Sequence, residues 1–275
     1  MIGDGDSFKF HCSTPPWSDR PPFPPRSVES VAASKHSTCL SSSLSFLKLT
    51  IFIVITTIHT TITTTTTTIM STGQIPPGGT YLNTLKRSFT DVPVQADNGN
   101  AIPTTEFLEA AESLVSIFDV LGSAAFSPVK SDMLGNVEKI RQRFLAAPTE
   151  SETLQDLVNN EQKAKENKAG QALLWLVRGL EFTCKGLANN VAAADQELST
   201  SFRAAYDVTL KPHHSFLIKP IFSAAMSACP YRKDFYTKLG DDQDKVNAQL
   251  KEYLAALENF VNILKAFLDS KGIKK

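Results

Sequence analysis

The sequence lacks an excess of charge of either sign. Its 275 residues include 28 Lys and Arg and 28 Asp and Glu, so the formal net charge is zero. A protein that binds nucleic acid without regard to sequence needs a surplus of basic side chains, because it neutralises phosphates. We therefore expect no nucleic-acid partner. The hydrophobic content of 42% is ordinary for a globular protein.

The sequence also lacks the short motifs that hold metals or activate nucleophiles. Its four cysteines form no CxxC pair and no close Cys/His pattern, so we expect no metal site. It has no Gly-x-Ser-x-Gly elbow and no glycine-rich phosphate loop. We therefore expect no cofactor and no enzymatic activity. Cys184 and Cys229 lie within apolar helical patterns, and buried reduced thiols are consistent with a cytoplasmic location.

Residues 1–69 lack the pattern of a folded domain. They consist of Pro-rich, Ser-rich and Thr-rich stretches, and residues 49–85 contain no Asp, Glu, Lys or Arg. The densest apolar part, residues 44–58, contains Lys48 and is shorter than the roughly 20 residues that span a bilayer. We predict that translation begins at Met70 and that residues 1–69 are a disordered extension, an artefact of the gene model. The alternative is a weakly hydrophobic membrane anchor.

Residues 70–275 have helical periodicity almost throughout, which predicts one all-α domain. Apolar residues recur at three- and four-residue spacing in residues 105–121, with Thr104 or Thr105 as the N-cap and Gly122 as the stop. Similar patterns predict further helices at 130–146, 151–164, 168–189, 196–211, 214–228 and 243–270, and a short turn or helix around 232–239. Pro220 falls inside one of them and should kink it.

The segment 171–187 is apolar around nearly its whole circumference, with Arg178 as the exception. A helix of this kind belongs in the middle of a protein. The sequence therefore predicts a two-layer helical sandwich of about eight helices, with one central buried helix.

One helix carries a line of polar residues beside its apolar stripe. At 100° per residue, Asp132, Asn136 and Lys139 fall within about 60° of one another, about 110° from the apolar stripe. One interpretation is a solvated helix flank. The other is the rim of a pocket, because Asp accepts, Lys donates and Asn does both, which suits sugar hydroxyls.

Trp175 and two adjacent histidines are further candidates. Trp175, in the central helix, is either a core residue or an aromatic platform under a sugar ring. His213 and His214 near a predicted helix start are either surface or capping residues, or members of a site.

These segments resemble the glycolipid transfer protein family. The resemblance covers roughly residues 105–268 and includes "SDMLGNVEKI", "LLWLVRGLEF" and "AYDVTLKPHHSFLIKPIF". The short N-terminus from Met70 most resembles the fungal members, which include a heterokaryon-incompatibility protein. The resemblance implies a two-layer all-α sandwich that encloses one sphingolipid.

The resemblance also implies roles for individual residues. Asp132, Asn136, Lys139 and Trp175 would bind the sugar, and Asp132 and His214 would bind the ceramide amide. Arg178 would be an internal partner that orients the acidic groups of the site. Ser215 and Phe216 stand where animal members have Gly and Trp, so Phe216 would take the aromatic membrane-docking role, with Lys219 facing lipid phosphates.

The branch of the family that resembles ceramide-1-phosphate transfer proteins has basic residues where this chain has Trp175 and Gln171. A stacking surface suits an uncharged sugar, whereas guanidinium groups suit a phosphate. The sequence thus predicts a monomeric, non-enzymatic carrier of galactosyl-, glucosyl- or lactosylceramide that docks transiently on membranes. The alternatives are a glycolipid sensor, a ceramide-1-phosphate-type carrier, or an all-α interaction scaffold without a ligand.

Overall fold

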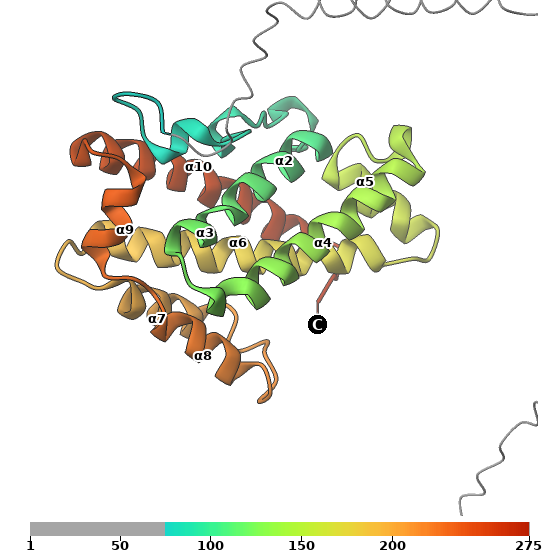
Figure 1. The fold of residues 1–275 in the computed structure, drawn as a ribbon. Helices are drawn as coiled ribbons and strands as arrows, with labels where there is room; N and C mark the ends of the chain where they lie inside the picture. The colour runs from blue at the N-terminus through green and yellow to red at the C-terminus, as the bar shows by residue number, and fades with distance from the viewer. Residues whose placement is uncertain (1–74, 275) are drawn as a thin grey trace, which may run out of the picture. The chain divides into compact units, whose positions relative to one another are not determined.

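A computed structural model describes residues 75–274, and most of these residues are helical. Apart from two isolated β-bridges, they contain no strand. The prediction of an all-α domain is therefore confirmed for this part of the chain (Figure 1). The predictions about residues 1–69 lie outside the described residues.

The α-helices are α2 (Thr104–Val115), α3 (Ile117–Leu121), α4 (Ser127–Ala146), α5 (Leu154–Lys163), α6 (Lys168–Ala192), α7 (Leu198–Val208), α8 (Lys219–Ser227), α9 (Arg232–Leu239) and α10 (Gln243–Ser270).

The described residues also contain short 3-10 helices. They are η1 (Tyr81–Thr84), η2 (Phe89–Asp91), η3 (Ala96–Asn98), η4 (Ala124–Phe126) and η5 (Pro148–Glu150). Within the described residues, no helix combines the length and the hydropathy that are needed to cross a bilayer. Cys184 is buried and Cys229 half-buried, both are free thiols, and burial raises the pKa of each to about 12.

The prediction of a single helix at residues 105–121 is wrong, because the helix is interrupted at Ser116, which separates α2 from α3. The Ser116 hydroxyl donates to the carbonyl oxygen of Ser113 at 2.5 Å and lies 2.5 Å from the Tyr81 hydroxyl. Serine side chains compete with the backbone for such bonds and weaken helix interiors. The predicted stop at Gly122 is confirmed, since this residue has the left-handed φ of 73°.

The predicted N-cap of α2 is also wrong. The helix follows Pro103, and Thr104 is its first residue. The Thr104 hydroxyl donates instead to the carbonyl oxygen of Ser151 at 2.7 Å, and so ties α2 to the segment before α5.

The helix predicted at 214–228 begins later and has no mid-helix proline. Residues 209–218 form turns, and α8 begins at Lys219. Pro220 is the second residue of α8, where its missing N–H removes no intrahelical bond. The expected kink is therefore absent, and a turn segment rather than a helix carries His213 and His214.

Helix α6 runs through the middle of the helical assembly, as its apolar circumference predicted (Figure 1). It packs against α4, α5, α7 and α10. Two glycines permit close approach: a Cβ at Gly186 would lie 2.5 Å from the Phe202 ring of α7, and one at Gly179 would lie 3.1 Å from Met133 of α4. The close contact with α4 brings the polar line of α4 beside the central helix.

The start of α6 is fixed by a side chain from α5. The buried carboxylate of Glu161 accepts hydrogen bonds from the backbone N–H groups of Ala169 and Gly170, each at 2.7 Å. These N–H groups belong to the first turn of α6, which has no intrahelical partners for them. A carboxylate at a helix N-terminus is also favoured by the helix dipole. Glu161 therefore acts as a cap supplied by the preceding helix.

Candidate functional site

The polar line on α4 is a continuous chain of hydrogen bonds. Lys139 Nζ donates to Asn136 Oδ1 at 3.2 Å, and Asn136 Nδ2 lies 3.4 Å from Asp132 Oδ2. Asp132 and Lys139 are exposed, whereas Asn136 is 3% exposed. The three side chains therefore lie at the border between the buried stripe of α4 and solvent, as their spacing predicted.

Asp132 is electrostatically perturbed. Desolvation by the surrounding protein raises the pKa of the Asp132 carboxyl above its usual range, and the positive charge of Lys139 partly offsets this. The hydrogen bond from Asn136 Nδ2, at 3.4 Å, is long and favours the charged form of this carboxylate only weakly. A ligand that donates further hydrogen bonds to Asp132 would favour the charged form more strongly.

Trp175 and Arg178 project from α6, one turn apart. Trp175 is half-buried, and the Arg178 guanidinium lies 4.9 Å from the centre of its ring system. Burial lowers the pKa of Arg178, while the charges of Asp269 and Glu181 raise it. The structure thus places Arg178 against the indole of Trp175, and the carboxylates that act on it are Asp269 and Glu181.

The turn after α7 supplies His214. Its backbone N–H donates to the carbonyl oxygen of Leu210 at 3.1 Å. The imidazole is stacked with Trp175, with a centroid distance of 6.0 Å and an interplanar angle of 18°, and lies 4.5 Å from the Phe222 ring. The imidazole is thereby held among aromatic rings from α6 and α8.

One hollow of about 460 Å³ unites the ligand-binding residues that were predicted from the sequence. It brings together side chains from α4, from α6 and from the turn before α8. Its polar wall can accept and donate hydrogen bonds, and its remaining wall is apolar and aromatic. The lining residues are Pro128, Asp132, Asn136, Lys139, Trp175, His213, His214, Ser215, Ile218, Ile221 and Phe222.

Two aromatic residues of this region were missed by the sequence analysis. Phe222 lines the hollow, and the Tyr206 hydroxyl lies 3.2 Å from His214 Nδ1. Phe222 follows the apolar pattern of α8 and reads as a core residue. Tyr206 is eight positions before His214, and only the turn between them brings the two side chains together.

The predicted membrane-docking residues lie in the same turn region but outside this hollow. Phe216 is 79% exposed, and Leu217 is 66% exposed. Phe216 and Lys219 line a neighbouring hollow of about 500 Å³ between α7 and α8. Arg203, Asp207 and Lys211 line it too, and Lys211 pairs with Asp207 at 2.7 Å, so a surface with more cations than anions borders the exposed aromatic ring.

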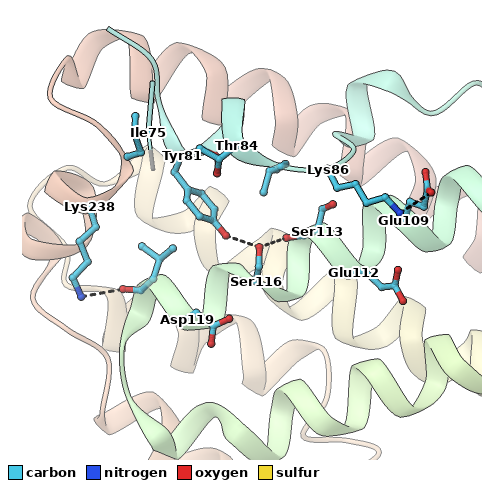
Figure 2. A pocket seen from close by; sticks show the side chains of 12 residues that line it. Ile75, Tyr81, Thr84, Lys86, Glu109, Glu112, Ser113, Ser116, Asp119 and Lys238 are labelled. Atoms are coloured by element: carbon cyan, nitrogen blue, oxygen red, sulfur yellow. Dashed lines mark hydrogen bonds and ion pairs between the residues drawn. The ribbon is translucent and has the colours of Figure 1, made fainter. Parts of the chain in front are cut away.

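A third hollow, of about 580 Å³, lies beside α2 and α3 (Figure 2). It contains none of the predicted site residues. Its lysines are already partnered: Lys86 pairs with Glu109 at 2.9 Å, and Lys238 donates to the carbonyl oxygen of Val120 at 3.1 Å. Figure 2 shows these contacts and the Tyr81–Ser116 hydrogen bond at its wall. We therefore regard the hollow beside Trp175 as the candidate site. The described residues include no group of His, Cys, Asp and Glu that could hold a metal ion.

Residues 102–241 match a family model described as "Glycolipid transfer protein (GLTP)". A glycolipid transfer protein of Aureobasidium melanogenum is 61% identical over 199 residues, which are 72% of this chain and 98% of that protein. The human "Pleckstrin homology domain-containing family A member 8" is 34% identical over 208 residues. That match covers 71% of this chain but spans only 40% of the length of the human protein.

Solved structures share the fold and confirm the prediction of an all-α helical sandwich. A structure described as HET-C2, a fungal glycolipid transfer protein, is 67% identical with a TM-score of 0.69 and is covered completely by 71% of this chain. A structure of FAPP2, described as selecting simple glycosphingolipids with this fold, is 31% identical with a TM-score of 0.65, over 71% of this chain and 98% of that one. Mouse ceramide-1-phosphate transfer protein, at 22% identity and a TM-score of 0.59 over 67% of this chain and 93% of that one, shares the fold alone.

Proposed function

Because the chain belongs to the glycolipid transfer protein family, as its sequence motifs indicated, we propose that it binds a glycosphingolipid and carries it between membranes. Such transfer makes and breaks no covalent bond, which agrees with the expectation that the chain is not an enzyme. We further propose that the chain acts as a monomer.

The observation that carries this proposal is the convergence of Asp132, Asn136, Lys139, Trp175 and His214 on one hollow. In our proposal the three α4 side chains bind sugar hydroxyls, which both donate and accept hydrogen bonds. The indole of Trp175 contacts the sugar ring. Asp132 accepts from the amide N–H of the ceramide, and His214 donates to its carbonyl oxygen.

A neutral sugar suits this hollow better than a phosphate. The cation on the α4 line, Lys139, is accompanied by the carboxylate of Asp132, and Trp175 presents an indole. A phosphate monoester would be repelled by the carboxylate and is recognised best by guanidinium groups. FAPP2, which is described as selecting simple glycosphingolipids with this fold, supports the same ligand class.

The free-energy barrier to unassisted transfer explains why a carrier is needed. Exposing two chains of roughly fifteen methylenes each to water costs on the order of 24 kcal/mol, at about 0.8 kcal/mol per methylene. A helical domain that opens an apolar interior while it is docked on a bilayer avoids most of this exposure. No metal or nucleotide is needed for such a step.

We further propose that the turn before α8 docks on the membrane. Four exposed large apolar side chains are close in sequence in this turn and the first turn of α8: Phe216, Leu217, Ile218 and Ile221, exposed by 79, 66, 37 and 41%. Insertion of these side chains into the interface would bring Lys219 to the level of the lipid phosphates. Since the net charge is zero, we expect docking to depend weakly on salt.

Vesicle-to-vesicle transfer of fluorescent lipids tests the proposal. We expect the full chain to transfer glucosyl- or galactosylceramide and to leave ceramide-1-phosphate in the donor vesicles. Binding of glycolipid without transfer would identify a sensor. Transfer of ceramide-1-phosphate in preference to glycolipid would contradict the ligand assignment, and an absence of any lipid binding would identify a scaffold.

A further inference from the structure

His214 is enclosed by aromatic side chains, one of which offers it a hydrogen bond. The Tyr206 hydroxyl lies 3.2 Å from Nδ1 of the imidazole. The Trp175 ring is stacked with the imidazole at 6.0 Å, and the Phe222 ring lies at 4.5 Å. The orientation of His214 is thus fixed by neighbours from α6, α7 and α8.

We propose that Tyr206 is a positioning residue that sets the tautomer of His214. Its hydroxyl donates to Nδ1, which leaves the ring proton on Nε2, where it can donate to an acceptor on the ligand. This inference rests on the proposed function for its ligand, a ceramide whose amide carbonyl is such an acceptor. The tautomer itself is a property of the protein without ligand.

The direction of the Tyr206–His214 hydrogen bond follows from the chemistry of the two groups. A neutral imidazole has one N–H donor and one acceptor nitrogen, and the partner of one nitrogen decides which tautomer is present. The unprotonated nitrogen of an imidazole, whose conjugate acid has a pKa of about 6.5, is a far stronger base than the oxygen of a neutral phenol, and a phenol with a pKa of about 10 is a stronger acid than the N–H of a neutral imidazole. The phenol therefore donates and Nδ1 accepts. Desolvation, followed by the charge of Asp207, raises the pKa of Tyr206, so its proton is retained.

The hydroxyl of Tyr206 is held in place by the packing of its ring. Tyr206 is 4% exposed. Its ring is stacked with Phe222, at 5.2 Å and 11°, and meets Phe182 edge to face at 6.3 Å and 82°. A donor fixed in this way before the ligand arrives adds no ordering cost on binding. The Nε2–H group of His214, which would donate to the ceramide carbonyl oxygen, is then in place before the ligand binds.

The direct test is ¹⁵N NMR of the histidine side chains of the full chain, without lipid, at a pH where His214 is neutral. We expect His214 to be protonated on Nε2. In Tyr206→Phe we expect a mixture of the two tautomers. Tyr253→Phe is the matched control, because Tyr253 is 2% exposed and its hydroxyl has no hydrogen-bond partner within the described residues. An Nδ1–H tautomer in the wild type, or an unchanged tautomer in Tyr206→Phe, would overturn the proposal.

The second readout is the affinity for glucosylceramide in vesicles. A net contribution of about 0.5–1.5 kcal/mol for one hydrogen bond corresponds to a loss of about 2- to 12-fold in Tyr206→Phe. The same substitution in a His214→Phe background should cost nothing further, because the partner is already absent. If Tyr206→Phe changes the tautomer of His214 but leaves the affinity unchanged, the proposal that the tautomer contributes to glycolipid binding is refuted. If the wild type binds no glycolipid, the proposed function fails, while the tautomer is still decided by NMR.

Discussion

Asp132→Asn should change lipid binding and protein stability in opposite directions. The substitution keeps the shape of the side chain, and Asn136 Nδ2, 3.4 Å from Asp132 Oδ2, still faces an acceptor. It removes the negative charge that sugar and amide donors would bind. It also removes a carboxylate whose pKa is raised chiefly by desolvation, so the folded state no longer contains an unfavourably placed charge.

The expected loss of glycolipid affinity follows from the hydrogen bonds that Asp132 would accept from the ligand. A hydrogen bond to a charged group contributes about 1.5–3 kcal/mol, so losing the charged character of one such bond should weaken glycolipid affinity by about 10- to 150-fold. If Asp132 accepts from both the sugar and the amide, the loss reaches the upper end. Transfer between vesicles should fall in proportion to the fraction of protein that is loaded.

The pH dependence of stability has a definite sign. Because the folded-state pKa of Asp132 lies above the unfolded value, the folded state binds more protons between those two values. The contribution of Asp132 to the free energy of unfolding therefore falls as pH rises through this window. Asp132→Asn should match the wild type below about pH 4 and be the more stable protein at neutral pH.

The measurements are vesicle transfer of glucosylceramide and thermal unfolding without lipid from pH 4 to pH 8. Glu138→Gln is the control, because it removes one negative charge from the exposed face of the same helix, outside the hollow. The reasoning is refuted if Asp132→Asn transfers lipid as fast as the wild type, or if it is less stable than the wild type at pH 7.

Three other substitutions test the platform, the docking turn and the core. Trp175→Ala should weaken glycolipid affinity by about 2- to 12-fold through loss of an aromatic contact of about 0.5–1.5 kcal/mol, as measured by lipid titration; an unchanged affinity would assign Trp175 to packing alone. Phe216→Ser should weaken sedimentation with vesicles by tenfold or more, since burying a Phe contributes about 1.5–3 kcal/mol, and should leave the melting temperature unchanged because the ring is 79% exposed. Gly186→Ala should lower the free energy of unfolding in urea by about 1–3 kcal/mol, because the new Cβ would overlap the Phe202 ring. The control, Gly135→Ala on an open helix surface, should raise it by up to about 1 kcal/mol.

The extent to which the sequence predicts the fold depends on how local the signals are. The long helix at residues 243–270 was predicted at its observed bounds, because a sustained apolar pattern is bounded by turn residues. The turn or helix predicted around residues 232–239 is the helix α9. The break at Ser116 was missed because it depends on Tyr81, which is 35 residues away. The start of α8 was missed because residues 209–218 are apolar enough to resemble a helix, yet form turns.

The candidate site, too, is predictable from the sequence only where its signals are local. The spacing of Asp132, Asn136 and Lys139 on one helix predicts that they share a border, and the structure has them linked by hydrogen bonds. Their distance from Trp175 and His214 depends on how α6 packs on α4 and on the path of the turn after α7. No periodicity encodes that path. For the same reason Tyr206, whose partner lies beyond the turn, has no signature in the sequence.

The contact of Glu161 with the first turn of α6 has a consequence for the distant indole. An α-helix behaves as a nearly rigid rod, so the rotation of its first turn about the helix axis determines the direction of every side chain farther along. Trp175 is six residues beyond Ala169, about 9 Å along the axis at 1.5 Å per residue. The orientation of the Trp175 indole is thus influenced by Glu161, a residue of α5 that does not line the hollow. A genetic screen for loss of the proposed glycolipid transfer should accordingly recover substitutions at Glu161 as well as at the residues that line the hollow.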